Sequence, residues 1–82
     1  MRAYVGSFTK NDGTTRRMYF ARLEDIPQGF LDAKTTGTGT SPVQPEGKEL
    51  VWDLQANNFR VFNYNTQQGE ITAFEYEENN LV

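Results

Sequence analysis

The first quarter of the chain alternates apolar and polar side chains with a period of two residues, which is typical of half-buried strands. Residues 2–9 form the first alternating run, and residues 14–22 form the second, with an apolar centre flanked by arginines. The polar segment Asn11-Asp12-Gly13 lies between them, and Gly13 can adopt the positive φ of a tight turn. This pattern predicts a β-hairpin.

A second pair of apolar-rich runs covers residues 48–53 and 58–64, and the polar turn 54–57 separates them. The first of these runs contains Trp52, the only tryptophan in the chain, so we expect it to anchor the core of a second hairpin. A further alternating run at residues 70–77 follows a turn over residues 66–69. Five strands joined mainly by short turns predict an all-β fold, a five-stranded SH3-like (Sm-like) small barrel.

The remaining segments carry weaker patterns. Leu23–Pro27 predicts one helical turn that Pro27 ends. Residues 31–47 are rich in Thr, Gly, Ser and Pro, and they predict one long, mobile loop. Within it, residues 34–46 are expected to exchange their amide hydrogens rapidly and to be cleaved first by protease. Residues 78–82 predict a frayed tail. With 82 residues, the chain is expected to form one domain, because two halves of this size would each lack a sufficient core.

Several of these residues together resemble a family of short bacteriophage proteins with an SH3-like, Sm-like barrel related to the WYL domain. The residues that carry the resemblance are Phe8, Lys10, Asp12, Gly13, Arg16, Met18, Val51, Trp52, Asp53, Phe59, Arg60 and Phe62. The resemblance implies a phage-encoded protein that acts in the infected bacterial cell. It transfers no catalytic residue, and the regulatory role of WYL domains favours regulation. Family members usually carry a basic central loop, whereas here only Lys34 and Lys48 flank it.

Charge is unevenly distributed along the chain. The net charge is −3, yet residues 1–22 hold five basic and one acidic side chain, and residues 23–82 hold three basic and ten acidic ones. The acidic excess argues against general binding to phosphate backbones, which depends on many Lys and Arg contacts. A local basic face remains compatible with these numbers.

Composition also limits the cellular setting and the chemistry that we expect. The chain has no Cys, no apolar run of about 18 residues and no signal-peptide pattern, so we expect a cytoplasmic protein without a membrane partner. It has no His, and its serines lack a partner base, which predicts that it is not an enzyme. The tail carboxylates lack the spacing of a calcium loop, and neither a metal site nor a cofactor is expected.

The remaining candidates for function are aromatic residues interleaved with arginine. The candidate binding residues are Arg16, Arg17, Trp52, Phe59 and Arg60. In proteins that bind single strands, aromatic rings stack on bases and arginines contact phosphates. The alternative interpretation is structural, because the interior of a small barrel is filled by bulky side chains, here Trp52, Phe59, Met18 and Phe20.

These observations support three functional hypotheses. The first is a non-catalytic interaction or regulatory module that binds a host or phage protein through a strand edge or the long loop. In this hypothesis the acidic surface from residue 70 onward favours a basic partner. The second is a single-stranded nucleic-acid-binding barrel that uses Arg16, Arg17 and Arg60. The third is an Sm-like subunit that self-associates into a dimer or ring as part of a particle.

Overall fold

The computed structural model describes residues 1–34 and 44–81, and Val82 and the central part of the predicted long loop, 35–43, lie outside the described residues. The elements in chain order are β1 (Arg2–Thr9), β2 (Thr15–Arg22), the 3-10 turn η1 (Leu23–Asp25), α1 (Gln28–Lys34), β3 (Lys48–Asp53), β4 (Asn58–Asn63), the 3-10 turn η2 (Tyr64–Thr66), β5 (Gln67–Glu75) and the 3-10 turn η3 (Glu78–Asn80). The all-β, five-stranded prediction is confirmed.

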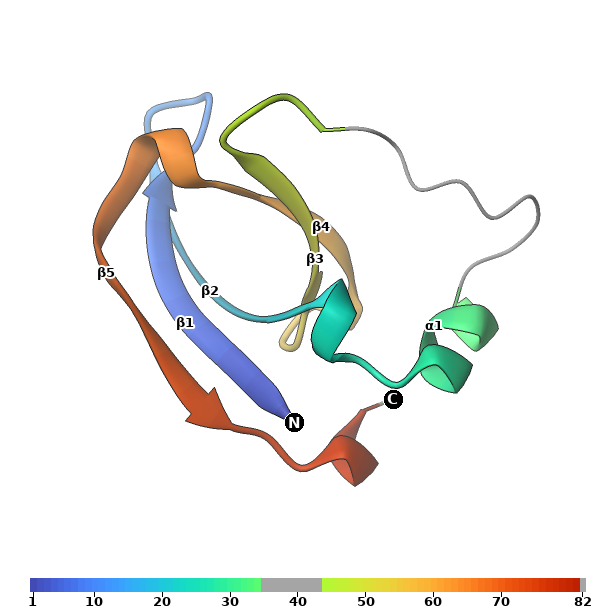
Figure 1. Cartoon of the computed structure of the whole chain (residues 1–82). Coiled ribbons are helices and arrows are strands. Elements are labelled where there is room, and N and C mark those ends of the chain that lie inside the picture. Colours follow the sequence, from blue (N-terminus) through green and yellow to red (C-terminus); the bar gives the residue numbers. More distant parts are fainter. Residues whose placement is uncertain (35–43, 82) are drawn as a thin grey trace.

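The five strands form one antiparallel sheet in the order β4-β3-β2-β1-β5. The sheet is strongly curved, so that the β3–β4 hairpin faces β1 and β5 across the molecule (Figure 1). It is not closed: no ladder joins β4 to β5, and these two strands form its outer edges. The described strands therefore leave the predicted barrel open, with two edges whose backbone groups have no neighbouring strand.

One hydrophobic cluster fills the concave face of the sheet. Its buried members are Phe8, Met18, Phe20, Val51 and Phe62, with Tyr4, Tyr64 and Ile71 packed against them. The ring of Phe62, on β4, lies 4.8 Å from the ring of Phe8 and 4.8 Å from the ring of Phe20, measured between centroids. Side-chain packing through Phe62 thus brings β4 close to β1 without a hydrogen-bonded ladder.

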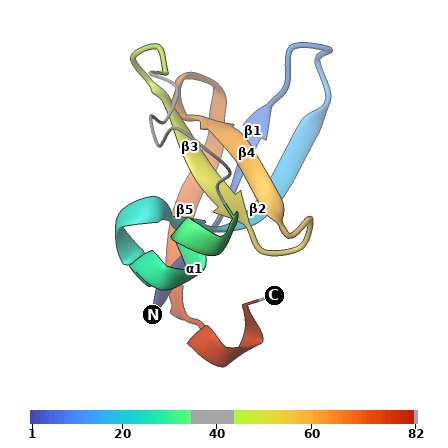
Figure 2. The same cartoon turned by 90° about the vertical axis from the view of Figure 1, so that its right-hand side faces the viewer.

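A second cluster covers the opposite face of β3. Trp52 is 2% exposed and packs with Ala21 and Ile26, beneath partly buried side chains of α1 and η1. Its ring meets those of Phe30 and Phe59 edge-on, at centroid distances of 5.2 and 5.0 Å. Figure 2 shows α1 lying against this side of the β3–β4 hairpin. Trp52 is therefore a core anchor, as predicted.

The prediction of a single barrel interior is wrong in one respect. Trp52 and Phe59 were expected to share it with Met18 and Phe20, but the two pairs lie in clusters on opposite faces of the sheet. The physical reason is the pleat: Val51 and Trp52 are adjacent in β3, so they must point to opposite faces. Each face has its own apolar cover.

Gly6 allows β5 to cross β1 at close range. The β1–β5 register shifts between Val5 and Ser7, which marks a β-bulge opposite Gly6. A Cβ atom at Gly6 would lie 2.8 Å from Cγ1 of Ile71 and 3.1 Å from Cζ of Phe62. Gly69, with a φ of +74°, belongs to the bulged part of β5. The turn predicted at residues 66–69 is therefore corrected: the turn is η2, and β5 begins at Gln67.

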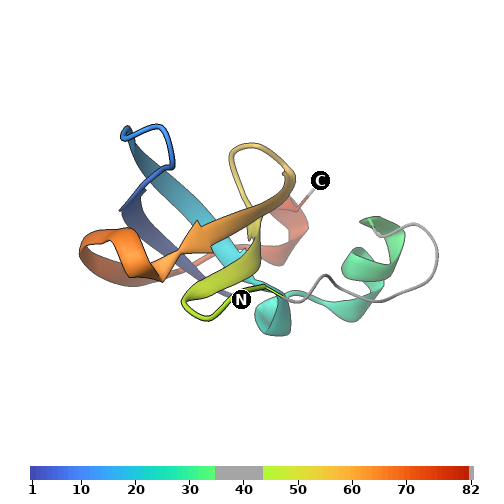
Figure 3. The ribbon, with the colours of Figure 1, turned by 90° about the horizontal axis from the view of Figure 1, so that it is seen from above.

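Two further predictions about local structure are corrected. Residues 31–34 belong to α1 and not to the loop, because Pro27 starts this helix as well as ending the preceding turn: its carbonyl accepts from the N–H groups of Phe30 and Leu31. The expected frayed tail is folded up to residue 81, since η3 forms and Leu81 packs against the Trp52 cluster. Figure 3 shows this last turn near the β3–β4 hairpin.

Candidate binding cleft

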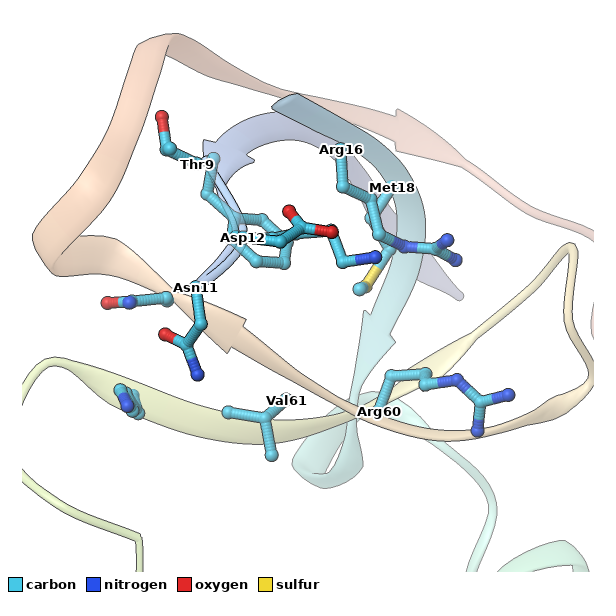
Figure 4. Close-up of a pocket in the computed structure, with 11 residues that line it drawn as sticks. Thr9, Asn11, Asp12, Arg16, Met18, Arg60 and Val61 are labelled. Carbon is cyan, nitrogen blue, oxygen red and sulfur yellow. The ribbon is translucent and has the colours of Figure 1, made fainter. Parts of the chain in front are cut away.

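The β1–β2 and β3–β4 hairpins separate at one end of the sheet and leave a cleft between them. β2 pairs with β3 over only three residue pairs, from Phe20–Asp53 to Arg22–Val51, so the rest of β2 is not paired with β3. The cleft has a volume of about 440 Å³. It is lined by Phe8, Thr9, Lys10, Asn11, Asp12, Arg16, Met18, Lys48, Arg60, Val61 and Asn63. Figure 4 shows the first hairpin on one wall and β4 on the other.

The cleft concentrates positive charge in an acidic protein. Four of the eight Lys and Arg residues line it, namely Lys10, Arg16, Lys48 and Arg60, against one of the eleven acidic residues, Asp12. The Asp12 carboxylate already accepts from the N–H and the hydroxyl of Thr14 at 3.0 and 2.6 Å, and these bonds lower its pKa. The cleft is therefore locally cationic and favours an anionic ligand.

Arg16 is held in the cleft wall by Asp53, the one buried charged residue among the described residues. An Arg16 Nη2 group donates to Oδ2 of Asp53, while Oδ1 accepts from the N–H groups of Gln55 and Ala56, both at 2.9 Å. Burial alone would raise the pKa of Asp53, but these hydrogen bonds outweigh it and hold the pKa below its ordinary value. The Asp53 carboxylate thus both stabilises the β3–β4 turn and holds the guanidinium of Arg16 in position.

The outer edge of β4 forms part of the cleft wall. Tyr64 donates its N–H to the Gly47 carbonyl at 2.7 Å, and this bond shows which residues of β4 form the hydrogen-bonded pairs with β3. Because bonding alternates along an antiparallel strand, the N–H and C=O of Phe62 face β3, whereas those of Val61 face outward. Val61 lines the cleft, so these two groups lie at its wall. They are available to an added strand.

Two residues before Val61, side chains already cap the outward-facing backbone groups of the β4 edge. At Phe59 the backbone N–H also faces outward, but it donates to Oδ1 of Asn58 at 2.8 Å, and the Phe59 carbonyl accepts from Nη1 of Arg60 at 2.8 Å. Such side-chain caps limit how far a strand can be added along an edge. The open part of the β4 edge is therefore centred on Val61.

The structure brings together two of the five residues that the sequence suggests for binding. Arg16 on β2 and Arg60 on β4 line facing walls of the cleft (Figure 4). Arg17 is exposed on the other face of β2, where its guanidinium lies 5.6 Å from the ring of Tyr19. Trp52 is buried, and Phe59 packs against it. These last two side chains therefore belong to the second hydrophobic cluster.

Sequence reasoning did not connect Lys10, Lys48 and Val61 with this site. Lys10 precedes the first turn, and Lys48 begins β3, 38 positions later in the chain. Only the curvature of the sheet brings them to one cleft. A signal for Val61 did exist, because strict alternation from the β3–β4 turn assigns its backbone groups to the side away from β3. The missing information was that β4 lies at the edge.

A second polar cluster lies on the concave face, away from the cleft. Nε of Arg22 donates to both carboxylate oxygens of Glu49, at 3.2 and 2.9 Å, and the Tyr64 hydroxyl donates to Oε1 of Glu49 at 2.6 Å. Burial and the Glu49 carboxylate together raise the pKa of Tyr64 well above its ordinary value. Nη1 of Arg22 also pairs with Glu24 at 2.8 Å, and the bonds to Glu49 tie η2 to β2 and β3.

No family model, curated protein or solved structure matches this chain. Within the described residues, no group of three or more acidic side chains is placed to hold a metal ion. No helix formed by residues 1–34 or 44–81 is long and apolar enough to cross a membrane. The cleft and the open sheet are therefore the features from which a function can be inferred.

Proposed function

We propose that this chain is a non-catalytic interaction module that binds a host or phage protein by adding a strand of the partner to the open edge of β4. The observation that carries the proposal is that Val61, a residue of the edge strand β4 whose backbone groups face outward, lines a preformed cleft. Backbone pairing at a sheet edge supplies affinity, and neighbouring side-chain sites supply specificity. Phage origin and a regulatory role rest on the resemblance alone, whereas cytoplasmic action rests on both the resemblance and the composition.

The β4 edge is a better candidate than the β5 edge. On β5 the outward-facing groups include those of Ala73, as the bonds between Tyr76 and Met1 fix the phase of the β1–β5 ladder. The edge at β5 lies outside the cleft, and β5 is exposed along most of its length. A partner on β5 would gain backbone bonds but no cleft for its side chains.

Proline substitution provides a test with a matched control. Val61→Pro removes an outward-facing N–H without touching the β3–β4 ladder, and Ala73→Pro does the same at the β5 edge. Both variants should fold, as circular dichroism and thermal unfolding will show. Wild-type protein and both variants then serve as baits in nuclease-treated bacterial lysate, and the captured proteins are identified and re-bound as purified proteins.

We expect a purified partner that binds wild type and Ala73→Pro equally but binds Val61→Pro at least tenfold more weakly, since a strand that loses one backbone bond and its register loses about 1.4 kcal/mol or more. Equal binding to all three baits would contradict edge addition at β4. Failure to isolate any directly binding protein would contradict the proposal as a whole.

A second candidate function is binding to single-stranded nucleic acid, and the four cations of the cleft favour it. However, base stacking needs an exposed aromatic face. The one aromatic residue in the lining, Phe8, is 7% exposed and packs on Phe62. We therefore expect no binding of mixed-sequence oligonucleotides tighter than about 10 μM at physiological salt. Fluorescence anisotropy at two salt concentrations measures this, and submicromolar, salt-sensitive binding that is lost in Arg60→Ala would favour nucleic acid.

A third candidate is self-association, which the presence of two open edges at opposite ends of the sheet favours. Pairing β4 of one copy with β5 of the next would use both edges and propagate head to tail. Sedimentation velocity over a concentration series measures the assembly state. In this case Val61→Pro and Ala73→Pro would both dissociate the assembly, whereas binding of a foreign strand at β4 predicts sensitivity to Val61→Pro alone.

A further inference from the structure

The four cations of the cleft lie on both sides of the open β4 edge. Lys10 and Arg16 come from the first hairpin, and Lys48 and Arg60 come from the second. An extended segment lying along β4 would therefore run between two pairs of positive charges. Because successive side chains of a strand alternate between faces, alternate residues of such a segment would meet the cleft.

We propose that the cleft selects an acidic, extended protein segment that places carboxylates at alternate positions, on the face that meets the cleft. This inference rests on the proposed function, since it names the partner of the same edge. It differs from the expectation of a basic partner, which is based on the acidic residues from residue 70 onward, because those residues lie outside the lining of the cleft. Charge complementarity at the cleft thus points to the opposite partner.

The chemistry of the cleft floor fits such a segment. Phe8 and Met18 form an apolar floor that belongs to the concave cluster, and this floor lies in the same cleft as the β4 residues Arg60 and Val61. The methylene groups of cleft-facing acidic side chains can cover this surface while their carboxylates reach the cations. A polynucleotide would bring a comparable negative charge, but it has no backbone N–H or carbonyl group that could continue the β4 ladder.

Arg16 contributes less to the positive charge of the cleft than its position in the lining suggests. Its guanidinium already pairs with Asp53, which neutralises much of its charge. Lys10, Lys48 and Arg60 have no ion pair among the described residues. Lys10 and Lys48 are therefore the side chains to substitute, since Arg16 supports the fold through Asp53 and Arg60 caps the carbonyl of Phe59.

The test uses the full chain and three end-blocked heptapeptides of alternating sequence: Glu-Val-Glu-Val-Glu-Val-Glu, its Gln-Val counterpart and its Lys-Val counterpart. Binding is measured by isothermal titration at low and physiological salt, with the oligonucleotide (dT)12 as a separate arm. The variant Lys10→Glu with Lys48→Glu reverses two cleft charges. The matched control is Arg2→Glu with Lys34→Glu, which makes the same change in net charge at exposed positions outside the cleft.

We expect the wild-type protein to bind the acidic peptide at least tenfold more tightly than the neutral one. In the variant Lys10→Glu with Lys48→Glu, the affinity for the acidic peptide should fall at least tenfold, so that the preference disappears. Tenfold corresponds to about 1.4 kcal/mol, which two reversed partly exposed charges can supply. The Arg2 and Lys34 control should stay within about threefold, since its charges act only at long range and are screened by salt. Higher salt should lower the affinity for the acidic peptide and leave the affinity for the neutral peptide unchanged.

The other outcomes separate this inference from the proposed function. If neutral and acidic peptides bind equally and Val61→Pro abolishes both, edge addition stands and the preference for acid is overturned. If the acidic peptide binds but Val61→Pro leaves it unaffected, the cleft attracts charge without adding a strand. If (dT)12 binds more tightly than the acidic peptide and competes with it, the ligand is a nucleic acid, and both proposals are contradicted. Absence of binding to every peptide also overturns the inference.

Discussion

Asp53 is the residue through which the fold and the cleft are most tightly connected, and Asp53→Asn is the substitution that tests this connection. The asparagine side chain has nearly the same shape, and its carbonyl oxygen can still accept from the N–H groups of Gln55 and Ala56. The ion pair with Arg16 is lost, because the amide NH2 replaces the oxygen that accepts from the guanidinium. The change therefore isolates the charge of Asp53 from its role in the turn.

The expected loss in the free energy of unfolding is about 2 to 3 kcal/mol at pH 7. A hydrogen bond to a charged group contributes roughly 1.5 to 3 kcal/mol, and a donor now faces a donor at a fully buried position. The side chain of Arg16 is 35% exposed, so its guanidinium can regain water, and this limits the loss. A domain of this length has about 4 to 12 kcal/mol in total, so the effect is large.

The difference should depend on pH in one direction. The folded state lowers the pKa of Asp53, so the folded protein binds fewer protons, and the stabilisation is complete above the ordinary value of about 4. It is lost as the pH falls through the lower folded-state pKa. The gap between wild type and Asp53→Asn should therefore be constant from pH 7 to 5 and narrow below pH 4.

Urea unfolding followed by the fluorescence of Trp52 at pH 7, 5, 4 and 3 measures this gap. Asp12→Asn is the matched control, because Asp12 is an exposed turn aspartate whose hydrogen bonds stay local, and its unfolding midpoint at pH 7 should be nearly unchanged. Equal stability of Asp53→Asn and wild type at pH 7, or a gap of the same size at pH 3, would refute the reasoning.

Three further substitutions test the packing, each by urea unfolding. Trp52→Ala should lose about 3 to 5 kcal/mol, because it empties the centre of the second cluster, and an unchanged thermal midpoint would contradict this. Gly6→Ala should lose about 1 to 3 kcal/mol through the clash with Ile71 and Phe62, and an unchanged unfolding midpoint would contradict this. Tyr64→Phe should lose about 0.5 to 1.5 kcal/mol of unfolding free energy below pH 10. Above pH 10 the difference from wild type should shrink, because the raised pKa of Tyr64 in the folded state means that the unfolded wild type loses the tyrosine proton first.

The period-two pattern was sufficient to predict β1 to β4, since each of these strands has side chains buried in an apolar cluster. The start of β5 was missed because Gln67, Gln68 and Gly69 are polar and exposed, and only their ladder with β1 makes them a strand. The helix α1 was missed for a related reason: it has seven residues, and its stability comes from packing Phe30 against Trp52 rather than from its own propensity.

The candidate site was only partly accessible to sequence reasoning. Arg16 and Arg60 stand out because arginine is interleaved with aromatic residues in these strands, but Arg17, Trp52 and Phe59 stand out by the same criterion and lie elsewhere. Strand order decides which residues face a cleft, and order depends on long-range contacts such as that between Phe8 and Phe62. A local pattern carries no information about contacts at that separation.

Amide hydrogen exchange at Val61 tests the central claim most directly. In the free protein the Val61 N–H faces outward from β4 and should exchange rapidly, whereas that of Phe62 faces β3 and should be protected. When the acidic peptide saturates the cleft, the account predicts that exchange at Val61 slows at least tenfold, while exchange at Ala73 on the β5 edge stays fast. Fast exchange at Val61 in the saturated complex would contradict strand addition at β4.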